Sequence, residues 1–270
     1  DIQSELVVFV AADAPVEIFR LTLTNASREV RELDITSYAE WLLGFAPDEH
    51  REFHKLFIET SVDLPAQAVL ARKRLWGFAD DRGRYNNVDW PYTAFMASSE
   101  PLKSFDCDKE TFIGLYHNDD QPQAMSDPAL AGRTGRFTDA IAALQVAVTL
   151  QPGETKTVVF TLGAAEDGKE DAGELIRRYT GVEQSHQAFQ DMQAFWSRFI
   201  DSEQVETPDD ALNFMTNTWL KYQSISCRLW GKSAFYQVSA GYGFRDQLQD
   251  SQIFLVSQPE YAKKQLLLHA

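Results

Sequence analysis

The feature that most constrains the fold of this 270-residue chain is a change in hydrophobic periodicity near Gly163. Before it, apolar and polar residues alternate over short segments such as 16–24, which is typical of strands with one buried face. After it, apolar residues recur every three or four positions, as on one face of an α-helix. The sequence therefore predicts a β-rich N-terminal part and a helical C-terminal part.

Short β-prone segments separated by turns predict an antiparallel β-sandwich. The expected strands are 5–10, 16–24, 30–42, 53–59, 66–75, 92–97, 111–115, 141–150 and 155–162. Segment 66–75 is also compatible with a short helix. Residues 25–28 supply turn chemistry within a meander, and residues 151–154 are expected to close a β-hairpin.

Helices are expected over 171–179, ended by Gly181, over 182–200, from Thr207 onward and over 251–270. Thr207 is the predicted N-cap, with Pro208 at the first helical position. The last three helices carry apolar stripes that we expect to be core rather than ligand contacts. The stripes are Phe189, Met192, Phe195, Trp196 and Phe199; Leu212, Met215, Thr216, Trp219, Tyr222 and Ile225; and Ile253, Val256, Leu266 and Leu267.

A long segment without periodicity, 118–136, is predicted to be a loop rich in Pro, Gly, Ser and Asp. A structureless loop of that length inside a compact domain is more often functional than idle.

The charge of the chain limits its partners. Forty acidic and 25 basic residues give a formal net charge of −15, which would repel nucleic acids and acidic membrane surfaces. Neutral substrates meet no such penalty, whereas a phosphate-using enzyme needs a local positive pocket. The 44% apolar content is ample for a core.

Cys107 and Cys227 show neither metal-type nor framework spacing, so reduced thiols are simpler than a disulfide, which stays open. No apolar run approaches the roughly 20 residues of a membrane helix, and the first residues show no signal-peptide pattern. We therefore expect a cytoplasmic protein without a membrane partner. Because the chain starts on a strand without Met and stops within a helical pattern, we also expect a segment of a longer polypeptide.

One stretch near the C-terminus, 241–250, concentrates the candidate functional side chains. Gly241 and Gly243 allow a tight turn or a close backbone approach to a ligand. The residues that follow are an arginine, two aspartates and two glutamines, which together suit a polyhydroxylated ligand: Arg245, Asp246, Gln247, Gln249 and Asp250. The alternative is an ordinary helix start with Asp246 near the positive end of the dipole.

The segments 233–237 (SAFYQ) and 241–250 (GYGFRDQLQD) closely resemble the inverting glycoside phosphorylases of the cellobiose phosphorylase type. The resemblance is closer still to the cellodextrin phosphorylase, β-1,2-glucan phosphorylase and cyclic glucan synthase branches. It continues at 134–136, 143–146 and 150–155, so it covers most of the chain. The run 243–250 is its most specific part.

The resemblance implies a multidomain α and β fold, in which a β-sandwich precedes a helical linker and an (α/α)6 barrel. Here it predicts the later part of the β-sandwich over 1–165, the linker over 166–205 and a truncated start of the catalytic barrel over 206–270.

The implied reaction is phosphorolysis of β-linked gluco-oligosaccharides, with inversion, to α-glucose 1-phosphate. Inorganic phosphate is the co-substrate, no metal or organic cofactor is required, and a homodimer is compatible with the family. The family's general acid is an aspartate further along the barrel. No residue of this chain matches it, so we expect no catalytic residue here.

By the same resemblance, Arg245 and Asp250 contact the donor sugar, Asp246 contacts the sugar or orients Arg245, and Gln249 supports them. Lys232 and Arg228 are candidates for phosphate binding. Relatives often carry Arg at the position of Lys232, and Lys lacks the bidentate fork, so a surface role for Lys232 stays open. Tyr236 and Trp230 suit stacking on a sugar or packing in the core.

Other sites are disfavoured. His50 and His54 have a zinc-like spacing without a third ligand, and Gly241 and Gly243 lack the third glycine of a dinucleotide site. Three other functions remain: a chain-length-trimming domain of a cyclic glucan synthase-type protein, a non-catalytic carbohydrate-binding or assembly segment, and a hydrolase on the same barrel.

Overall fold

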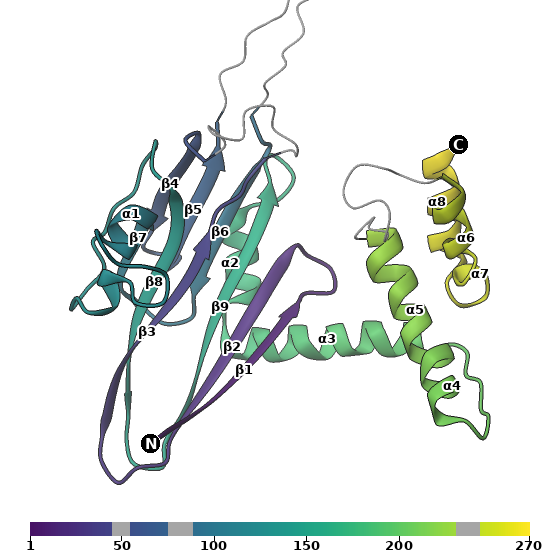
Figure 1. The fold of residues 1–270 in the computed structure, drawn as a ribbon, viewed down its shortest axis with the longest axis horizontal. Helices are drawn as coiled ribbons and strands as arrows, with labels where there is room; N and C mark the ends of the chain where they lie inside the picture. The colour runs from purple at the N-terminus through teal and green to yellow at the C-terminus, as the bar shows by residue number, and fades with distance from the viewer. Residues whose placement is uncertain (45–54, 75–88, 231–243) are drawn as a thin grey trace, which may run out of the picture. The chain divides into compact units, whose positions relative to one another are not determined.

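The structure, a computed structural model, describes residues 1–44, 55–74, 89–230 and 244–270 (Figure 1). The chain divides into two compact units, Asp1–Phe189 and Gln190–Ala270. The predicted domain boundaries at 165 and 205 stay predictions.

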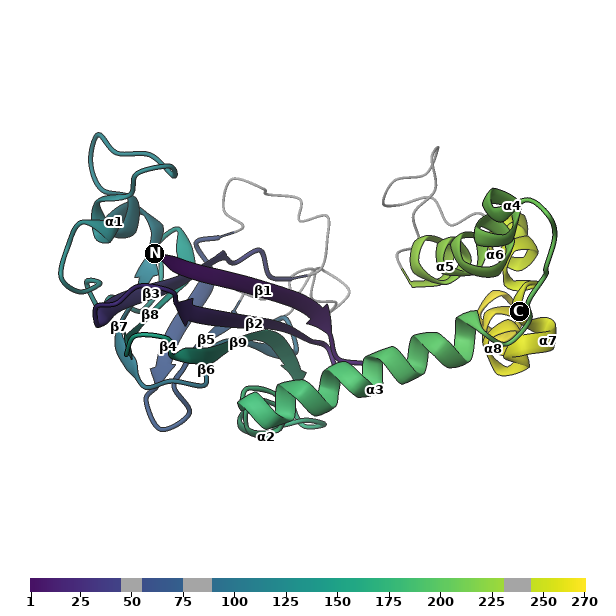
Figure 2. The same cartoon turned by 90° about the horizontal axis from the view of Figure 1, so that it is seen from below.

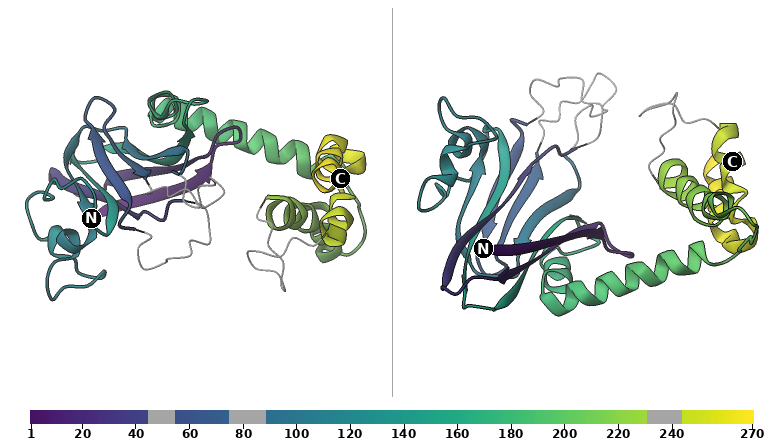
Figure 3. Two further views of the ribbon diagram at one scale, coloured as in Figure 1. Left: turned by 90° about the horizontal axis from the view of Figure 1, so that it is seen from above. Right: turned by 60° about the horizontal axis from the view of Figure 1, so that its bottom comes forward.

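The first unit is a sandwich of two antiparallel sheets, as predicted (Figures 1 and 3). A six-stranded sheet has the order β1-β2-β9-β6-β5-β4, and a three-stranded sheet has the order β3-β8-β7. The strands are β1 Ile2–Val10, β2 Val16–Asn25, β3 Arg31–Glu40, β4 Ile58–Asp63, β5 Ala68–Lys73, β6 Tyr92–Ser98, β7 Leu102–Asp108, β8 Ala140–Leu150 and β9 Thr155–Glu166.

Strand β8 is the centre of the packing. Its residues Leu144 and Val146 face the other sheet in the main core, which also holds Ile58 and Phe160. Its alternate residues, including Ile141, pack on the opposite face against a second apolar cluster. Because both faces of β8 are buried, its sequence is apolar almost throughout.

The connections of the sandwich differ from the predicted meander. The turn at 151–154 is present, since the Glu154 amide donates to the Gln151 carbonyl at 3.0 Å and Gly153 adopts φ 78°. However, β8 pairs with β3 and β7 whereas β9 pairs with β2 and β6, so the predicted hairpin is wrong. The two strands bury their apolar faces from opposite sides of the core, and local turn chemistry does not encode that choice.

The predicted strand at 111–115 is also wrong. These residues belong mainly to a short helix, α1 Lys109–Ile113, whose N-cap Asp108 accepts a hydrogen bond from the Glu110 amide. The sequence prediction missed strand β7, which precedes it. Strand β4 starts at Ile58 rather than at 53, and residues 53 and 54 lie outside the described residues. Segment 66–75 forms a strand over Ala68–Lys73.

The first unit carries helix α2 Ala172–Tyr179 on the outer face of its six-stranded sheet (Figure 2). The Thr180 and Thr161 hydroxyls are 2.7 Å apart, and the Tyr179 hydroxyl donates to Asp13 at 2.7 Å. Helix α3 Val182–Ile200 follows with the predicted bounds.

The second unit is helical, as predicted. Residues 210–230 are helical throughout, as α4 Asp210–Phe214, a π-helical segment Met215–Trp219, α5 Leu220–Gln223 and a second π-helical segment Ser224–Trp230. The remaining helices are α6 Phe244–Ser251, α7 Phe254–Ser257 and α8 Pro259–His269. The single helix predicted over 251–270 is therefore divided.

Helix α4, which follows α3 along the chain, does not begin where predicted. Asp209 is its N-cap and accepts hydrogen bonds from the Ala211 and Leu212 amides. Thr207 lies before it, where its hydroxyl donates to Asn213. The carboxylate of Asp209 thus takes the capping role expected of Thr207.

The core of the second unit contains Phe199, Ile225, Phe254 and Ala262. The buried position of Phe199, with Phe195 and Trp196 packed against this core, confirms part of the apolar stripe expected on α3. The two later stripes are mostly exposed: Leu212 is 50% exposed, Trp219 40% and Val256 75%. The prediction as core is wrong for these three residues, whereas Ile225 is buried and Ile253 packs against the core, as predicted. No helix of the described segments is both long and apolar enough to cross a membrane.

Candidate functional site

Residues 244–250 of the polar stretch form most of helix α6, whereas 241–243 lie outside the described residues. Because residues 244–251 are helical, Asp246 and Asp250 lie one turn apart on the same face, as do Arg245 and Gln249. These two pairs are adjacent around the helix. The four side chains therefore make one continuous polar surface, called here the α6 strip.

Arg245 and Asp246 form an ion pair within the α6 strip. The guanidinium nitrogen Nη2 of Arg245 lies 3.0 Å from Oδ1 of Asp246. The Arg245 side chain is 85% exposed and that of Asp246 is 35% exposed. Asp246 thus fixes one nitrogen of the guanidinium while its other donors stay open to a ligand. This geometry favours the orienting role of Asp246.

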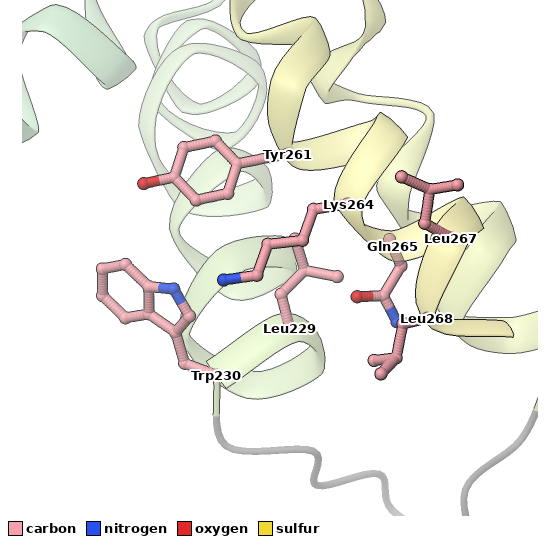
Figure 4. A pocket seen from close by; sticks show the side chains of 7 residues that line it. All are labelled: Leu229, Trp230, Tyr261, Lys264, Gln265, Leu267 and Leu268. Carbon is pink, nitrogen blue, oxygen red and sulfur yellow. The ribbon is translucent and has the colours of Figure 1, made fainter.

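The second unit also contains a cavity of about 440 Å³ (Figure 4). Trp230 ends the second π-helical segment and the other polar lining residues, Tyr261, Lys264 and Gln265, come from α8. In Figure 4, the Lys264 ammonium points toward the indole ring of Trp230, and the ring of Tyr261 lies above both in this view. Aromatic rings beside an amine and an amide suit a small polar molecule with an apolar face.

Helices α6 and α8 contact each other. The rings of Phe244 and His269 meet edge to face with centroids 5.4 Å apart. His269 also lies 3.0 Å from the side-chain nitrogen of Gln265, which lines the cavity. The α6 strip and the cavity are therefore on directly packed elements.

Trp230 is half exposed rather than core. Its ring stacks on Phe195 with centroids 5.8 Å apart, and 51% of its surface is accessible. One side of the indole is thus held by packing while the remainder can meet a ligand. This supports the stacking alternative for Trp230 without identifying the ligand.

Several predicted site residues cannot be placed. Lys232 and Tyr236 lie outside the described residues, as do His50 and His54. The helix position of Arg228 is described but its side chain is not. The roles of these residues stay predictions.

The described residues contain no group of three metal-ligating side chains. Cys107 is a free thiol in the sandwich core, and burial raises its pKa to about 12. It is therefore protonated at neutral pH and unsuited to act as a nucleophile.

Sequence reasoning missed Tyr261, Lys264 and Gln265. Tyr261 and Lys264 are three positions apart on α8, so helical periodicity alone could have placed them on one face. Their proximity to Trp230 depends on tertiary packing, and no local pattern signals it.

Comparisons with known proteins identify the family. Residues 1–182 match the model "Glycosyl hydrolase 94, supersandwich domain", and residues 195–270 match "Glycosyl hydrolase 94 superfamily, catalytic domain". The first match covers the β-sandwich with α2, and the second covers the helices that carry the α6 strip and the cavity.

Curated relatives match along nearly the whole chain. The cyclic beta-(1,2)-glucan synthase NdvB of Rhizobium meliloti (strain 1021) is 34% identical over 94% of this chain and 8% of its own length. The solabiose phosphorylase of Paenibacillus borealis is 30% identical over 96% of this chain and 31% of its own length. The N,N'-diacetylchitobiose phosphorylase of Vibrio proteolyticus is 26% identical over 98% of this chain and 32% of its own length.

This chain thus spans from 8% to about a third of the length of these relatives. The family predicted from the 241–250 stretch is confirmed, with both its sandwich and its catalytic domain represented. The chain belongs to the glycosyl hydrolase 94 family.

Proposed function

We propose that this chain is part of an inverting glycoside phosphorylase that cleaves β-linked gluco-oligosaccharides with inorganic phosphate. The observation that carries the proposal is the match of its two parts to the two glycosyl hydrolase 94 domains. Two of the relatives named above are phosphorylases by name.

The proposed chemistry is a single displacement at the anomeric carbon. Phosphate oxygen attacks from the face opposite the glycosidic bond, the bond between carbon and leaving oxygen breaks, and a carboxylic acid gives its proton to that oxygen. The products are α-glucose 1-phosphate and a shortened acceptor. Because phosphate is the nucleophile, one carboxylic acid suffices. We assign that acid to no residue of this chain.

The role proposed for this chain is to hold the donor sugar. Arg245 and Asp250 would bind its hydroxyls from the α6 strip, which fixes the anomeric carbon for in-line attack. Asp246 would hold Arg245 in place, as their 3.0 Å contact supports. Gln249 would add a hydrogen bond from the neighbouring position. Tyr236 is proposed to contact the sugar, and Lys232 and Arg228 the phosphate.

The test of this proposal is the phosphate dependence of sugar release by the full-length protein. With cellobiose, cellotriose, sophorose and β-1,2-glucotriose as substrates, we expect turnover that rises with phosphate concentration and saturates. Turnover that is unchanged in phosphate-free buffer would identify a hydrolase instead.

A second candidate is chain-length trimming within a cyclic glucan synthase-type protein. The 34% identity to cyclic beta-(1,2)-glucan synthase NdvB favours it. It predicts activity confined to β-1,2-linked substrates in the same panel, and a full-length polypeptide that also forms β-1,2-glucan. Phosphorolysis of β-1,4-linked substrates by a protein without synthase activity would exclude it.

A further inference from the structure

The segment that joins α1 to β8 exposes two aromatic side chains. Tyr116 is 97% exposed and Phe137 is 68% exposed. They lie at the two ends of the long polar segment that sequence analysis marks as functional, 118–136. Together with Leu115, 77% exposed, they place large apolar surfaces in water on this part of the sandwich unit.

Both aromatic residues also have left-handed backbone conformations. The φ angle is 65° at Tyr116 and 64° at Phe137. Bulky residues rarely adopt this region, which costs them on the order of 1 kcal/mol relative to glycine. A glycine or asparagine would relieve the strain and remove the exposed ring. At both positions the aromatic residue destabilises the fold, through backbone strain and through exposure of its ring to water. Its presence there points to a role other than folding.

The conformation at Tyr116 is imposed by its surroundings. Gly114 approaches Gln123 so closely that a Cβ atom there would lie 2.5 Å from the Gln123 Cβ. The His117 amide donates to the Gly114 carbonyl at 3.3 Å, and the His117 ring nitrogen Nδ1 lies 2.9 Å from the Gln121 carbonyl oxygen. These contacts hold the backbone on both sides of Tyr116, and its ring, 97% exposed, extends into water.

Phe137 is flanked by two ion pairs. The preceding Arg136 binds Glu59 at 2.7 Å, and Asp139 binds Lys55 at 2.6 Å. Both partners come from the β4 side of the sandwich, so the segment is fixed on either side of the ring.

The chemistry of the segment favours a neutral carbohydrate. His117, Asn118 and Gln121 stand beside Tyr116 and can exchange hydrogen bonds with hydroxyl groups. Asp119 and Asp120 follow in the same turn and, with the net charge of −15, oppose a polyanion. They also oppose a protein partner, because the core of a protein interface is depleted in charge. Single aromatic rings among hydrogen-bonding side chains suit a pyranose ring, which has an apolar face and hydroxyl groups around its edge.

We propose that the segment 114–137 is a carbohydrate-binding surface, in which Tyr116 and Phe137 each stack on a pyranose ring of a gluco-oligosaccharide. It belongs to the sandwich unit, whereas the α6 strip belongs to the second unit. The identity of the sugar as a β-linked glucan rests on the proposed function, whereas the surface itself does not.

The test is calorimetric titration of the full-length protein with cellohexaose and with β-1,2-glucohexaose. It is performed in an Arg245→Ala background, in which binding at the α6 strip is weakened. We expect Tyr116→Ala and Phe137→Ala each to weaken binding of one of the two hexasaccharides about fivefold or more. Tyr116→Trp should keep the affinity. Leu64→Ala, which removes a 57% exposed side chain elsewhere on the same unit, should leave it unchanged.

Unchanged affinity for both sugars in the double variant Tyr116→Ala/Phe137→Ala would overturn the inference. A change in molecular mass on sedimentation of that variant, without a loss of sugar affinity, would overturn it in favour of a protein contact. Failure of the proposed function is distinguishable, because phosphorolysis would then be absent while the ring-dependent sugar binding persists.

Discussion

Among single residues, the ion pair of Arg245 and Asp246 bears most directly on the proposed site. Replacement of Arg245 by Ala removes the donors proposed to hold the donor sugar, so we expect kcat/KM for phosphorolysis to fall about 100-fold. The unfolding midpoint should stay unchanged, because the side chain is 85% exposed. Lys263→Ala is the matched control, since Lys263 is an exposed cation paired with Glu260 on α8. Near-normal turnover in Arg245→Ala would remove this residue from the site.

The role of Asp246 is tested by a double-mutant cycle with Arg245. If Asp246 acts by orienting the guanidinium, Asp246→Asn should lower kcat/KM less than Arg245→Ala does. In the double variant Asp246→Asn should add almost nothing, because the group it orients is gone. Additive losses in kcat/KM would instead indicate that Asp246 contacts the sugar itself.

Glu40 gives the sandwich a defined pH dependence. Lys109 and Lys55 donate to its carboxylate at 2.6 and 2.9 Å and lower its pKa from 4.5 to about 2. Because the folded value lies below the unfolded one, these contacts stabilise the fold above about pH 4.5. Their contribution is lost as the pH falls toward 2.

We expect Glu40→Gln to lower the urea midpoint at pH 7, by a margin that shrinks below pH 4.5. Urea titrations at pH 7, 5, 4 and 3 would measure that difference. A margin independent of pH would show that packing, rather than charge, is what Glu40 contributes.

At the scale of elements, helix α4 depends on its N-cap. Asp209 accepts two amide hydrogen bonds at 2.9 and 3.1 Å from the first turn of α4. Asp209→Ala should therefore lower the free energy of unfolding by about 1 kcal/mol. Asp210→Ala changes the next residue and keeps both capping bonds, so its effect should be smaller. Equal losses in the two variants would contradict the assignment of the cap.

The sequence predicted elements well where one face of a segment is buried. Strand β2 and helix α3 were found from their hydrophobic period, since the packing of each repeats along the chain. The segment 111–115 was misassigned because Thr111 and Ile113 favour strands, whereas the Asp108 cap stabilises a helix there. The sequence prediction placed β8 and β9, the strands on either side of 151–154, in one hairpin. They belong to different sheets, because the pairing of each strand depends on residues distant in sequence.

In the candidate site, too, local features were predictable from the sequence and features that depend on tertiary packing were not. The i,i+4 arrangement of Asp246 and Asp250 followed from the sequence once a helix was assumed. The cavity beside Trp230 and the strained, exposed Tyr116 did not, since exposure and backbone φ are properties of the folded chain.

For the whole molecule, stability of the sandwich unit should depend on the contact between its two sheets. Leu144 is fully buried there, in the centre of the three-stranded sheet. We expect Leu144→Ala to cost about 2–5 kcal/mol of unfolding free energy, measured by urea denaturation. Leu64→Ala, on an exposed turn, should change it by less than about 0.5 kcal/mol. Similar effects of the two substitutions would show that Leu144 does not lie in the core.

The central claim concerns the reaction of the whole protein, and the configuration of its product tests it most directly. The full-length protein would be mixed with a β-linked gluco-oligosaccharide and phosphate, and the products followed by proton and phosphorus NMR. We predict that α-glucose 1-phosphate is the first product, formed in equal amount to the shortened acceptor. Release of free glucose, or of β-glucose 1-phosphate, would contradict inverting phosphorolysis.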